Sequence, residues 1–361
     1  MFRKILRREL DFIKKLDING LIPEIPIIQG GMAVGVSLDG LASAVANEGG
    51  IGIIGTAGIG LVENISSGSV RRDNLEGLKN VIRRAKEKTK GIIGVNIMVA
   101  LSDYSEMVKT AIKENVDLII SGAGLPLSLP SFLEETSKTK LIPIVSSLKS
   151  AQIIFKKWMK SYGYIPDAFI VEGPQAGGHL GYREENLEDE NYSLETTVPQ
   201  VVKFSEEIFR QYGKKVPVIA AGGIDSREKA QKMFMMGASG IQVGTPFIAT
   251  KECDADIKFK QTVINASEED IKIIKSPVGL PGRAVKNKFL EEVERGIQKP
   301  FRCAYQCIKT CKVTNAPYCI AQALLNAAKG NMEKGFAFTG SNGYKIKEIT
   351  DVKTVIKTII G

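Results

Sequence analysis

The sequence lacks long hydrophobic runs. None of its 361 residues falls in a segment with the roughly 18 uninterrupted apolar residues that a membrane span needs. The basic N-terminal stretch 1–20 contains acidic residues and no unbroken apolar core, so it does not have the form of a signal peptide. We expect it to be a helix packed beneath the main fold, in a cytoplasmic protein with no membrane partner.

Cysteine is also scarce. Four of the five cysteines lie close together near the C-terminus, which is not the arrangement of a secreted disulfide framework. Zinc-finger spacing, RNA-binding signatures, internal repeats and low-complexity segments are absent, so nucleic acid is not an expected partner. The formal net charge of +9 is spread along the chain, as on a solvated surface, and steering of anionic ligands is the second explanation.

Short apolar runs alternate with amphipathic helical patterns. The runs are rich in Ile and Val and apolar on both faces, which is typical of buried parallel strands. They occupy residues 26–31, 51–55, 91–98, 118–122, 141–147, 168–173, 216–223 and 240–247. Eight such runs favour an α/β fold of the (β/α)₈ TIM-barrel type over an open doubly wound sheet. We expect the final stretch, 351–361, to be the helix that closes the barrel.

Two stretches interrupt this alternation. Residues 182–200 are polar and acidic, and are too long for a plain strand-to-helix turn, so we expect a lid over the barrel mouth. From about Lys251 to Pro317 the strand–helix pattern stops. We therefore predict a barrel made of residues 1–250 and 318–361, with an inserted, small and mainly helical subdomain at 251–317.

The strongest local signal is a pair of glycine-rich strand ends, VIAAGGI (218–224) and GASGIQVGTPF (237–247). Glycine allows backbone N–H groups to converge on an anion without a Cβ in the way. In barrels, the loops after strands seven and eight commonly form a phosphate site. These are the seventh and eighth runs here. Two tight turns without a ligand are the simpler alternative.

His179, the only histidine, lies in VEGPQAGGHLG (171–181), a glycine-rich loop just past a strand. Catalytic residues of barrels occupy this end of the strands, and an imidazole changes charge near neutral pH. We predict a catalytic or substrate-binding role over a purely structural one. Weaker signals at other strand ends are PIIQGGM (26–32) and GVNIM (94–98), which turn chemistry alone could also explain.

In this order, the motifs PIIQGGM, GVNIM, SGAGLP, VEGPQAGGHLG, PVIAAGGI and GIQVGTPF resemble the nitronate monooxygenase (2-nitropropane dioxygenase) family. The flavin-dependent enoyl-ACP reductases share its scaffold. The resemblance covers residues 22–250 and resumes weakly at 336–349. It implies that the cofactor is FMN and that His179 is the base or substrate anchor. The residues that it implies for cofactor binding are Gln29, Gly30, Gly31, Met32, Asn96, Glu172, Gly177, Gly178, Ala221, Gly222, Gly223, Gln242, Gly244, Thr245, Gly340 and Ser341.

The resemblance implies an FMN-dependent oxidoreductase that oxidises alkyl nitronates with O₂. The alternative is an NAD(P)H-dependent reductase of enoyl thioesters or quinones, which would use the same residues with NAD(P)H as electron donor. A third hypothesis is a barrel that has lost catalysis and serves as a sensor or partner protein. The presence of His179 argues against it. We expect a small-molecule substrate and leave a homodimer open.

The cysteine group comprises Cys303, Cys307, Cys311 and Cys319, within RCAYQCIKTCKVTNAPYC. The first three are spaced at i, i+4 and i+8, which predicts one face of a helix. Four thiolates could hold an iron–sulfur cluster or zinc, although the spacing matches neither the ferredoxin run nor a zinc ribbon. Reduced core thiols are the favoured interpretation, and no metal site is predicted.

Overall fold

The computed structural model describes residues 15–361 apart from residues 298, 300 and 304. The helix predicted within residues 1–20 therefore lies for the most part outside the described residues. None of the described helices is both long and apolar enough to cross a membrane.

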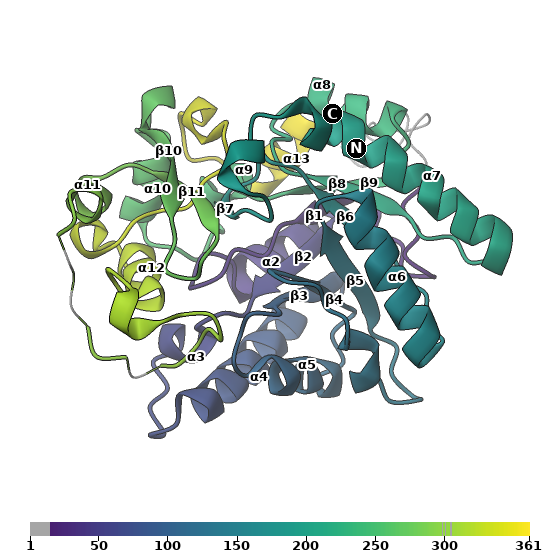
Figure 1. The fold of residues 1–361 in the computed structure, drawn as a ribbon, viewed down its shortest axis with the longest axis horizontal. Coiled ribbons are helices and arrows are strands. Elements are labelled where there is room, and N and C mark those ends of the chain that lie inside the picture. Colours follow the sequence, from purple (N-terminus) through teal and green to yellow (C-terminus); the bar gives the residue numbers. More distant parts are fainter. Residues whose placement is uncertain (1–14, 298, 300, 304) are drawn as a thin grey trace.

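Eight parallel strands form a closed barrel, in the order in which they follow one another along the chain (Figure 1). They are β1 (Ile27–Gln29), β2 (Ile51–Gly55), β3 (Ile92–Met98), β4 (Leu118–Gly122), β5 (Lys140–Val145), β6 (Phe169–Glu172), β8 (Val218–Ala221) and β9 (Gly240–Val243). The barrel closes where β9 pairs in parallel with β1, with Ile241 opposite Ile27. The predicted barrel and its eight apolar runs are confirmed, and the open sheet is excluded.

Apolar residues fill the barrel on both faces of its strands. Inside, Leu16 and Ile18 from the preceding segment pack with strand residues such as Ile53 and Ile120, all almost completely buried. A larger cluster lies between the strands and the surrounding helices, and includes the fully buried Trp158. Because both faces of these strands are buried, their sequences are continuous apolar runs.

Helices follow the strands and cover the outside of the barrel. The principal ones are α2 (Asp39–Asn47), α4 (Val70–Lys88), α5 (Tyr104–Lys113), α6 (Leu148–Tyr162), α7 (Leu194–Tyr212), α8 (Arg227–Met235) and α13 (Val352–Ile360), with short α3 (Ile59–Val62) and α9 (Thr245–Ile248). Side chains define several starts. Ser147 and Ser150 form a reciprocal capping box at α6, and the carboxylate of Asp351 accepts from the Thr354 N–H at α13. The predicted final helix is confirmed.

The acidic stretch 182–200 is only partly a loop. Two 3₁₀ turns, η2 (Glu184–Asn186) and η3 (Glu190–Tyr192), precede α7, which already begins at Leu194. The Ser193 hydroxyl caps this helix by accepting from the Thr196 N–H, and Pro199 is tolerated inside it. The prediction of a single long insertion over 182–200 was therefore wrong for its second half. The polar residues there belong to the first turns of α7.

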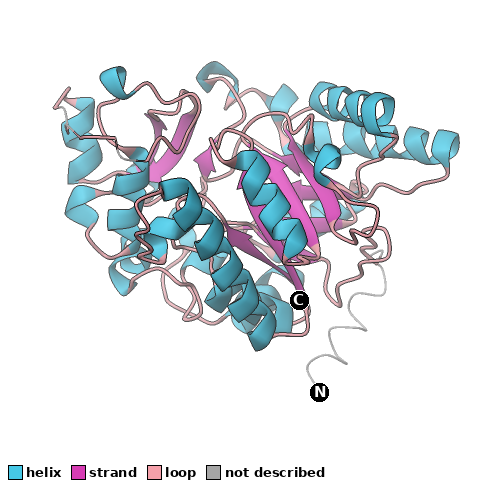
Figure 2. Ribbon diagram, turned by 90° about the horizontal axis from the view of Figure 1, so that it is seen from below, coloured by secondary structure: helices cyan, strands magenta, loops and turns pink. Residues whose placement is uncertain are grey.

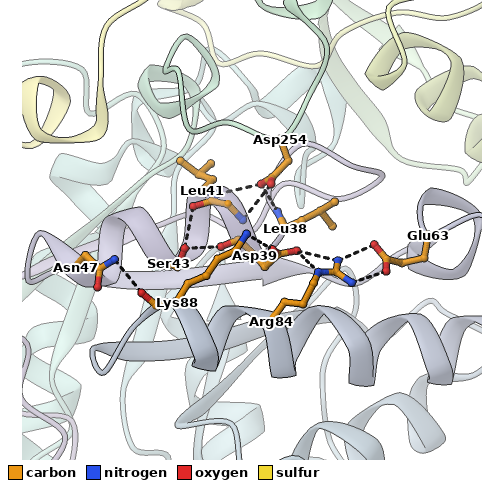
Figure 3. A network of polar contacts seen from close by, with 10 residues as sticks. Leu38, Asp39, Leu41, Ser43, Asn47, Glu63, Arg84, Lys88 and Asp254 are labelled. Atoms are coloured by element: carbon orange, nitrogen blue, oxygen red, sulfur yellow. Dashed lines mark hydrogen bonds and ion pairs between the residues drawn. The ribbon is translucent and has the colours of Figure 1, made fainter.

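A polar network fixes the segment after β9 to the first barrel helix (Figure 3). The Asp254 carboxylate accepts backbone N–H groups of Leu38, Gly40 and Leu41 at the start of α2, at 2.7–3.1 Å. On the other side of α2, Arg84 of α4 forms ion pairs with Asp39 and Glu63, both at 2.8 Å. A carboxylate at a helix N-terminus is stabilised by the helix dipole, so this contact supports the seam between the last and first strands.

A second, smaller unit stands beside the barrel mouth and contains its own sheet (Figure 2). Strand β11 (Pro281–Val285) pairs antiparallel with β10 (Ile271–Lys275) on one side and with β7 (Gly178–His179) on the other. Around it lie α10 (Ile257–Ile264), α11 (Lys288–Glu294) and α12 (Ile320–Ala328). The expectation of a mainly helical region missed this sheet.

The small unit has a core of aromatic residues. Phe289, Tyr318 and Phe336 are nearly completely buried and pack ring to ring, with centroids 5.3–6.1 Å apart. Two of them follow residue 317, so the chain still contributes to this core after the segment predicted as the subdomain. Strand β10, IKIIK, is half-buried, which is why it lacks the continuous apolar run of the barrel strands.

Candidate active site

A cavity of about 710 Å³ opens at the C-terminal ends of the barrel strands, between the barrel and the small unit. Its walls come from the segments after β1, β8 and β9, from the end of β6, from β7 and from the loop that follows Phe338. Its volume is in the range of sites for cofactors and small molecules. The C-terminal strand ends are also where barrel enzymes place their active sites.

Nearly all the site residues predicted from the sequence line this one cavity. They are His179, Gly30, Gly31, Met32, Asn96, Glu172, Gly177, Gly178, Ala221, Gly222, Gly223, Gln242, Gly244, Thr245 and Gly340. Residues from six separate stretches of sequence thus share one space. Which of them contact a cofactor stays a prediction.

Gln29 and Ser341 lie behind the cavity wall. The Gln29 side chain is fully buried and accepts the Ile53 N–H at 3.0 Å, which ties β1 to β2. It also donates to the Gly30 carbonyl oxygen. The backbone N–H of Ser341 donates to the Gln175 carbonyl oxygen at 3.1 Å. Both residues therefore hold cavity-lining neighbours in place.

One end of the cavity combines glycines with lysines. Gly222 and Gly223 follow β8 with φ of +96° and +81°, a left-handed backbone that favours glycine. Lys229 donates to the Gly223 carbonyl oxygen at 3.0 Å and pairs with Asp225 at 2.9 Å. Lys345, Lys347 and Thr245 line the same cavity. Backbone turns of this kind beside ammonium groups favour a phosphate.

Two cavity-lining glycines permit close backbone approach. A Cβ on Gly31 would lie 2.4 Å from the Cβ of Asn96, and a Cβ on Gly177 would lie 2.5 Å from the carbonyl carbon of Thr339. Both distances are shorter than van der Waals contact allows, so each wall can have this shape only with glycine. At these two points the backbone therefore packs directly against Asn96 and against Thr339.

The donors and acceptors left over fit a flavin nucleotide. Gln242, at the end of β9, is buried, and its side-chain oxygen has no hydrogen-bond partner within the described part of the chain. Buried polar atoms without a partner are rare and mark a place for a ligand or water. With the glycine–lysine end for a phosphate and the unpartnered Gln242 oxygen for a ligand donor, the cavity fits a flavin cofactor.

His179 lies on β7, where it is held by the small unit rather than by the barrel. Its Nε2 is 2.7 Å from the Ser276 hydroxyl, and its ring packs edge-on against Phe338 with centroids 5.0 Å apart. Burial lowers the pKa of the imidazole to about 4. The ring is therefore neutral at pH 7, and can donate or accept one proton.

Glu172, the last residue of β6, brings a second titratable group to the cavity. No described residue donates a hydrogen bond to its carboxyl group, and burial raises its pKa to about 7. The neighbouring Tyr182 hydroxyl lies 2.6 Å from the Glu172 backbone oxygen and fixes the strand end. A carboxyl group that titrates near neutral pH can hold or release a proton during a reaction.

Arg283 and Ser276 are site residues that sequence reasoning missed. The buried Arg283 guanidinium donates to the carbonyl oxygens of Pro174 and Ala176, at 2.7 and 2.6 Å, and so shapes the loop that leads to His179. Both residues lie in the segment predicted as a separate subdomain. Their only sequence signal was the loss of strand–helix alternation, which does not indicate a contact with the barrel.

The four C-terminal cysteines are not on a helix. The described residues among 301–312 contain no helix, and Cys319 is the residue just before α12, so the predicted helical face was wrong. All four are free thiols. Burial raises the pKa of Cys307 to about 12 and also raises the pKa of Cys311 and Cys319, with charge on the other thiolates adding to each rise. The sulfurs thus lie within electrostatic reach of one another.

A closed parallel barrel with a nucleotide-sized cavity at its strand ends, lined by paired glycines and a half-buried histidine, defines a cofactor-dependent barrel enzyme. The chain belongs to the nitronate monooxygenase family, because that family's model matches residues 17–361. It is thus an enzyme of the flavin oxidoreductase type.

Individual relatives agree with this assignment. A probable nitronate monooxygenase of Staphylococcus aureus (strain Newman) is 26% identical over 297 residues, which cover 75% of this chain and 78% of the relative. FabK from Thermotoga maritima has a similar structure, with a TM-score of 0.71 and 26% identity over 98% of this chain and 94% of that one. Nitroalkane oxidase from Streptomyces ansochromogenes shares the fold, with a TM-score of 0.69 and 20% identity over 93% and 94% of the two chains.

Proposed function

We propose that this protein is an FMN-dependent oxidoreductase that oxidises alkyl nitronates with O₂. The observation that carries the proposal is a neutral, half-buried imidazole, His179, at the wall of a cavity that also fits a flavin nucleotide. A nitronate is a small anion whose charge rests on the oxygens of its nitro group. A neutral N–H donor can bind such oxygens without the cost of burying a second charge.

The cofactor assignment follows from the two ends of the cavity. Gly222, Gly223, Gly244 and Thr245, with Lys229 beside them, would hold the phosphate. The wall formed by Gly31 and Asn96 and the wall formed by Gly177 and Gly178 would receive the ring system. When bound, FMN supplies the redox chemistry, and the protein supplies placement and electrostatics.

The tautomer of His179 determines what it can do. The Ser276 oxygen already accepts the Val278 N–H at 3.4 Å. With the Ser276 hydroxyl proton donated to Nε2 at 2.7 Å, the imidazole proton is on Nδ1 and available to a nitro oxygen. The same imidazole can accept a proton from a neutral nitroalkane if the tautomer is reversed. Ser276 is thus a positioning residue for the histidine.

One observation favours a second candidate, a reductase that takes electrons from NAD(P)H and passes them to enoyl thioesters or quinones. The similarity to FabK extends over 98% of this chain, the small unit included. Against a polyanionic carrier substrate, the loop after β7 is acidic, with Glu184, Glu185, Glu188, Asp189 and Glu190 between its start and α7. Like charges at the site of encounter oppose association.

The test is to mix the purified yellow protein under anaerobic conditions with a short alkyl nitronate and, separately, with NADH and NADPH. Rapid bleaching of flavin absorbance by nitronate alone, with O₂ uptake on aeration, is the expected result. We expect His179→Ala to slow the reaction by about 10²–10⁴-fold. Glu188→Gln, at an exposed position of the acidic loop, is the control that leaves the rate unchanged.

Other outcomes point elsewhere. Bleaching by NADH or NADPH, with no response to nitronate, transfers the assignment to the reductase. A protein that neither carries nor binds FMN contradicts the proposal at its first step. Ser276→Ala provides a finer test, because loss of the Ser276 hydroxyl is expected to change the pH profile of the nitronate reaction while flavin remains bound.

A further inference from the structure

The cysteine group has no role in the function proposed above, yet its surroundings have features of a ligand-binding site. Cys307 lines the main cavity, and with Tyr305 and Gln306 it also lines a second cavity of about 340 Å³. A thiol placed between two cavities has room for a further group beside it.

The segment that carries the cysteines is tied to both neighbouring elements. The Ser102 N–H donates to the Cys307 carbonyl oxygen at 3.0 Å, and Lys309 donates from its backbone to the Ala100 carbonyl oxygen at 2.9 Å. On the opposite side, the Tyr305 hydroxyl donates to the Gln322 side chain at 2.8 Å, within the first turn of α12. Because Cys319 immediately precedes that helix, the loop and the fourth cysteine are drawn together.

The sulfurs also have the backbone donors that thiolate ligands use. The chain turns at Gln306, whose φ is +43°, and its N–H points at the Cys303 sulfur at 3.3 Å. Cys319 occupies the N-cap of α12, where the first N–H groups of a helix have no partners within the helix. Hydrogen bonds to sulfur are one of the features that tune iron–sulfur centres.

Charge supports a negatively charged occupant. Between Phe301 and Cys319 the sequence contains Arg302, Lys309 and Lys312 and no aspartate or glutamate. Basic residues around four thiolates offset the negative charge that these carry when they bind a metal. This stretch is thus a cationic loop with four thiols.

The described side chains do not offer a site for a single metal ion. Among the residues that the structure describes, no three histidine, cysteine or acidic side chains converge closely enough for a single metal ion. A zinc ion binds thiolates at about 2.3 Å and would need that convergence. An iron–sulfur cluster places several iron atoms between its ligands, so its cysteines stand farther apart.

We propose that Cys303, Cys307, Cys311 and Cys319 bind a [4Fe–4S] cluster at the wall of the main cavity. Each cysteine supplies one thiolate to one iron, and binding releases the four thiol protons to solvent. No net electron transfer is needed when the cluster forms from equal parts of ferrous and ferric iron with sulfide. The proposal is independent of the substrate, since it concerns only these side chains.

The test uses the full chain, purified anaerobically and also incubated with ferrous iron, ferric iron and sulfide. We expect about four iron atoms and four sulfide ions per chain, and a low-temperature paramagnetic resonance signal of a cluster after reduction with dithionite. Single Cys→Ser substitutions at the four positions should abolish the sulfide content. Cys253→Ser is the matched control, because Cys253 is buried elsewhere and donates to the Val36 carbonyl oxygen, which serine can also do.

The alternatives give different readings. Zinc without sulfide, disulfides in the mass of the native protein, or iron that survives the substitutions would overturn the proposal. Flavin content, measured on the same samples, shows whether each variant has folded. Cys311→Ser and Cys303→Ser are the informative variants if Cys307→Ser does not fold, since neither of these residues lines the main cavity as Cys307 does.

Discussion

Replacement of the cavity carboxyl group, Glu172→Gln, should change the pH dependence of stability in a defined direction. Burial raises the pKa of Glu172 from 4.5 to about 7, so the folded protein holds this proton more tightly than the unfolded chain does. Stability is therefore lost as pH rises from 4.5 through 7. A difference of about 2.5 in pKa corresponds to about 3 kcal/mol in the free energy of unfolding. Glutamine keeps the shape and cannot ionise.

The assay is urea unfolding of the flavin-free protein at a series of pH values from 4.5 to 8, because bound ligand would add its own stabilisation. Glu172→Gln should equal the parent at pH 4.5 and exceed it by up to about 3 kcal/mol at pH 8. Glu188→Gln, which changes an exposed carboxyl group, should follow the parent throughout. Parallel curves for the parent and Glu172→Gln would refute the reasoning.

Three further perturbations have expected outcomes. Because burial lowers the pKa of His179 to about 4, the free energy of unfolding of the parent should fall by about 3 kcal/mol as pH falls from 6.5 to 4. His179→Gln should remove this loss in the same urea assay extended down to pH 4. Gly177→Ala places a Cβ 2.5 Å from the Thr339 backbone and should cost about 1–3 kcal/mol in thermal unfolding, whereas Gly181→Ala, with 3.7 Å of room, should cost much less. Arg283→Met removes the donor to two carbonyl oxygens of the loop that leads to His179, and should lower the free energy of unfolding by about 1–3 kcal/mol. It should also speed flavin release, which is measured by fluorescence. Unchanged release would contradict the role of Arg283 in shaping that loop.

The barrel could be predicted from the sequence because its strands are buried on both faces. Runs such as IGIIG and LIISG contain no polar residue that faces solvent, and they became β2 and β4 with the predicted bounds. The small sheet gave no such signal. Strand β7 has only two residues, and β10 mixes two lysines with three isoleucines, so neither forms the continuous apolar run that marks the barrel strands.

The site residues could be predicted to lie together because most of them lie at the end of a barrel strand or just after it, and the parallel strands all end at the same face of the barrel. What the sequence could not indicate was contact across the insertion. Ser276 reaches His179 from 97 positions away, and Arg283 reaches Pro174 from 109. The i, i+4, i+8 cysteines show the converse error, because a helical spacing alone was taken for a helix, and the described residues of this segment form none.

The pairing of β7 with β11 has a consequence for how such enzymes can diversify. Gly178 lies opposite Arg283 and His179 opposite Gly282, so the histidine that serves the barrel is aligned by a strand of the small unit. A chimaera that exchanged residues 251–317 between relatives would therefore acquire a new alignment of the His179 imidazole along with the new segment. Recombination that preserves activity therefore has to exchange the two paired strands, β7 and β11, together, although they lie about a hundred residues apart in the sequence.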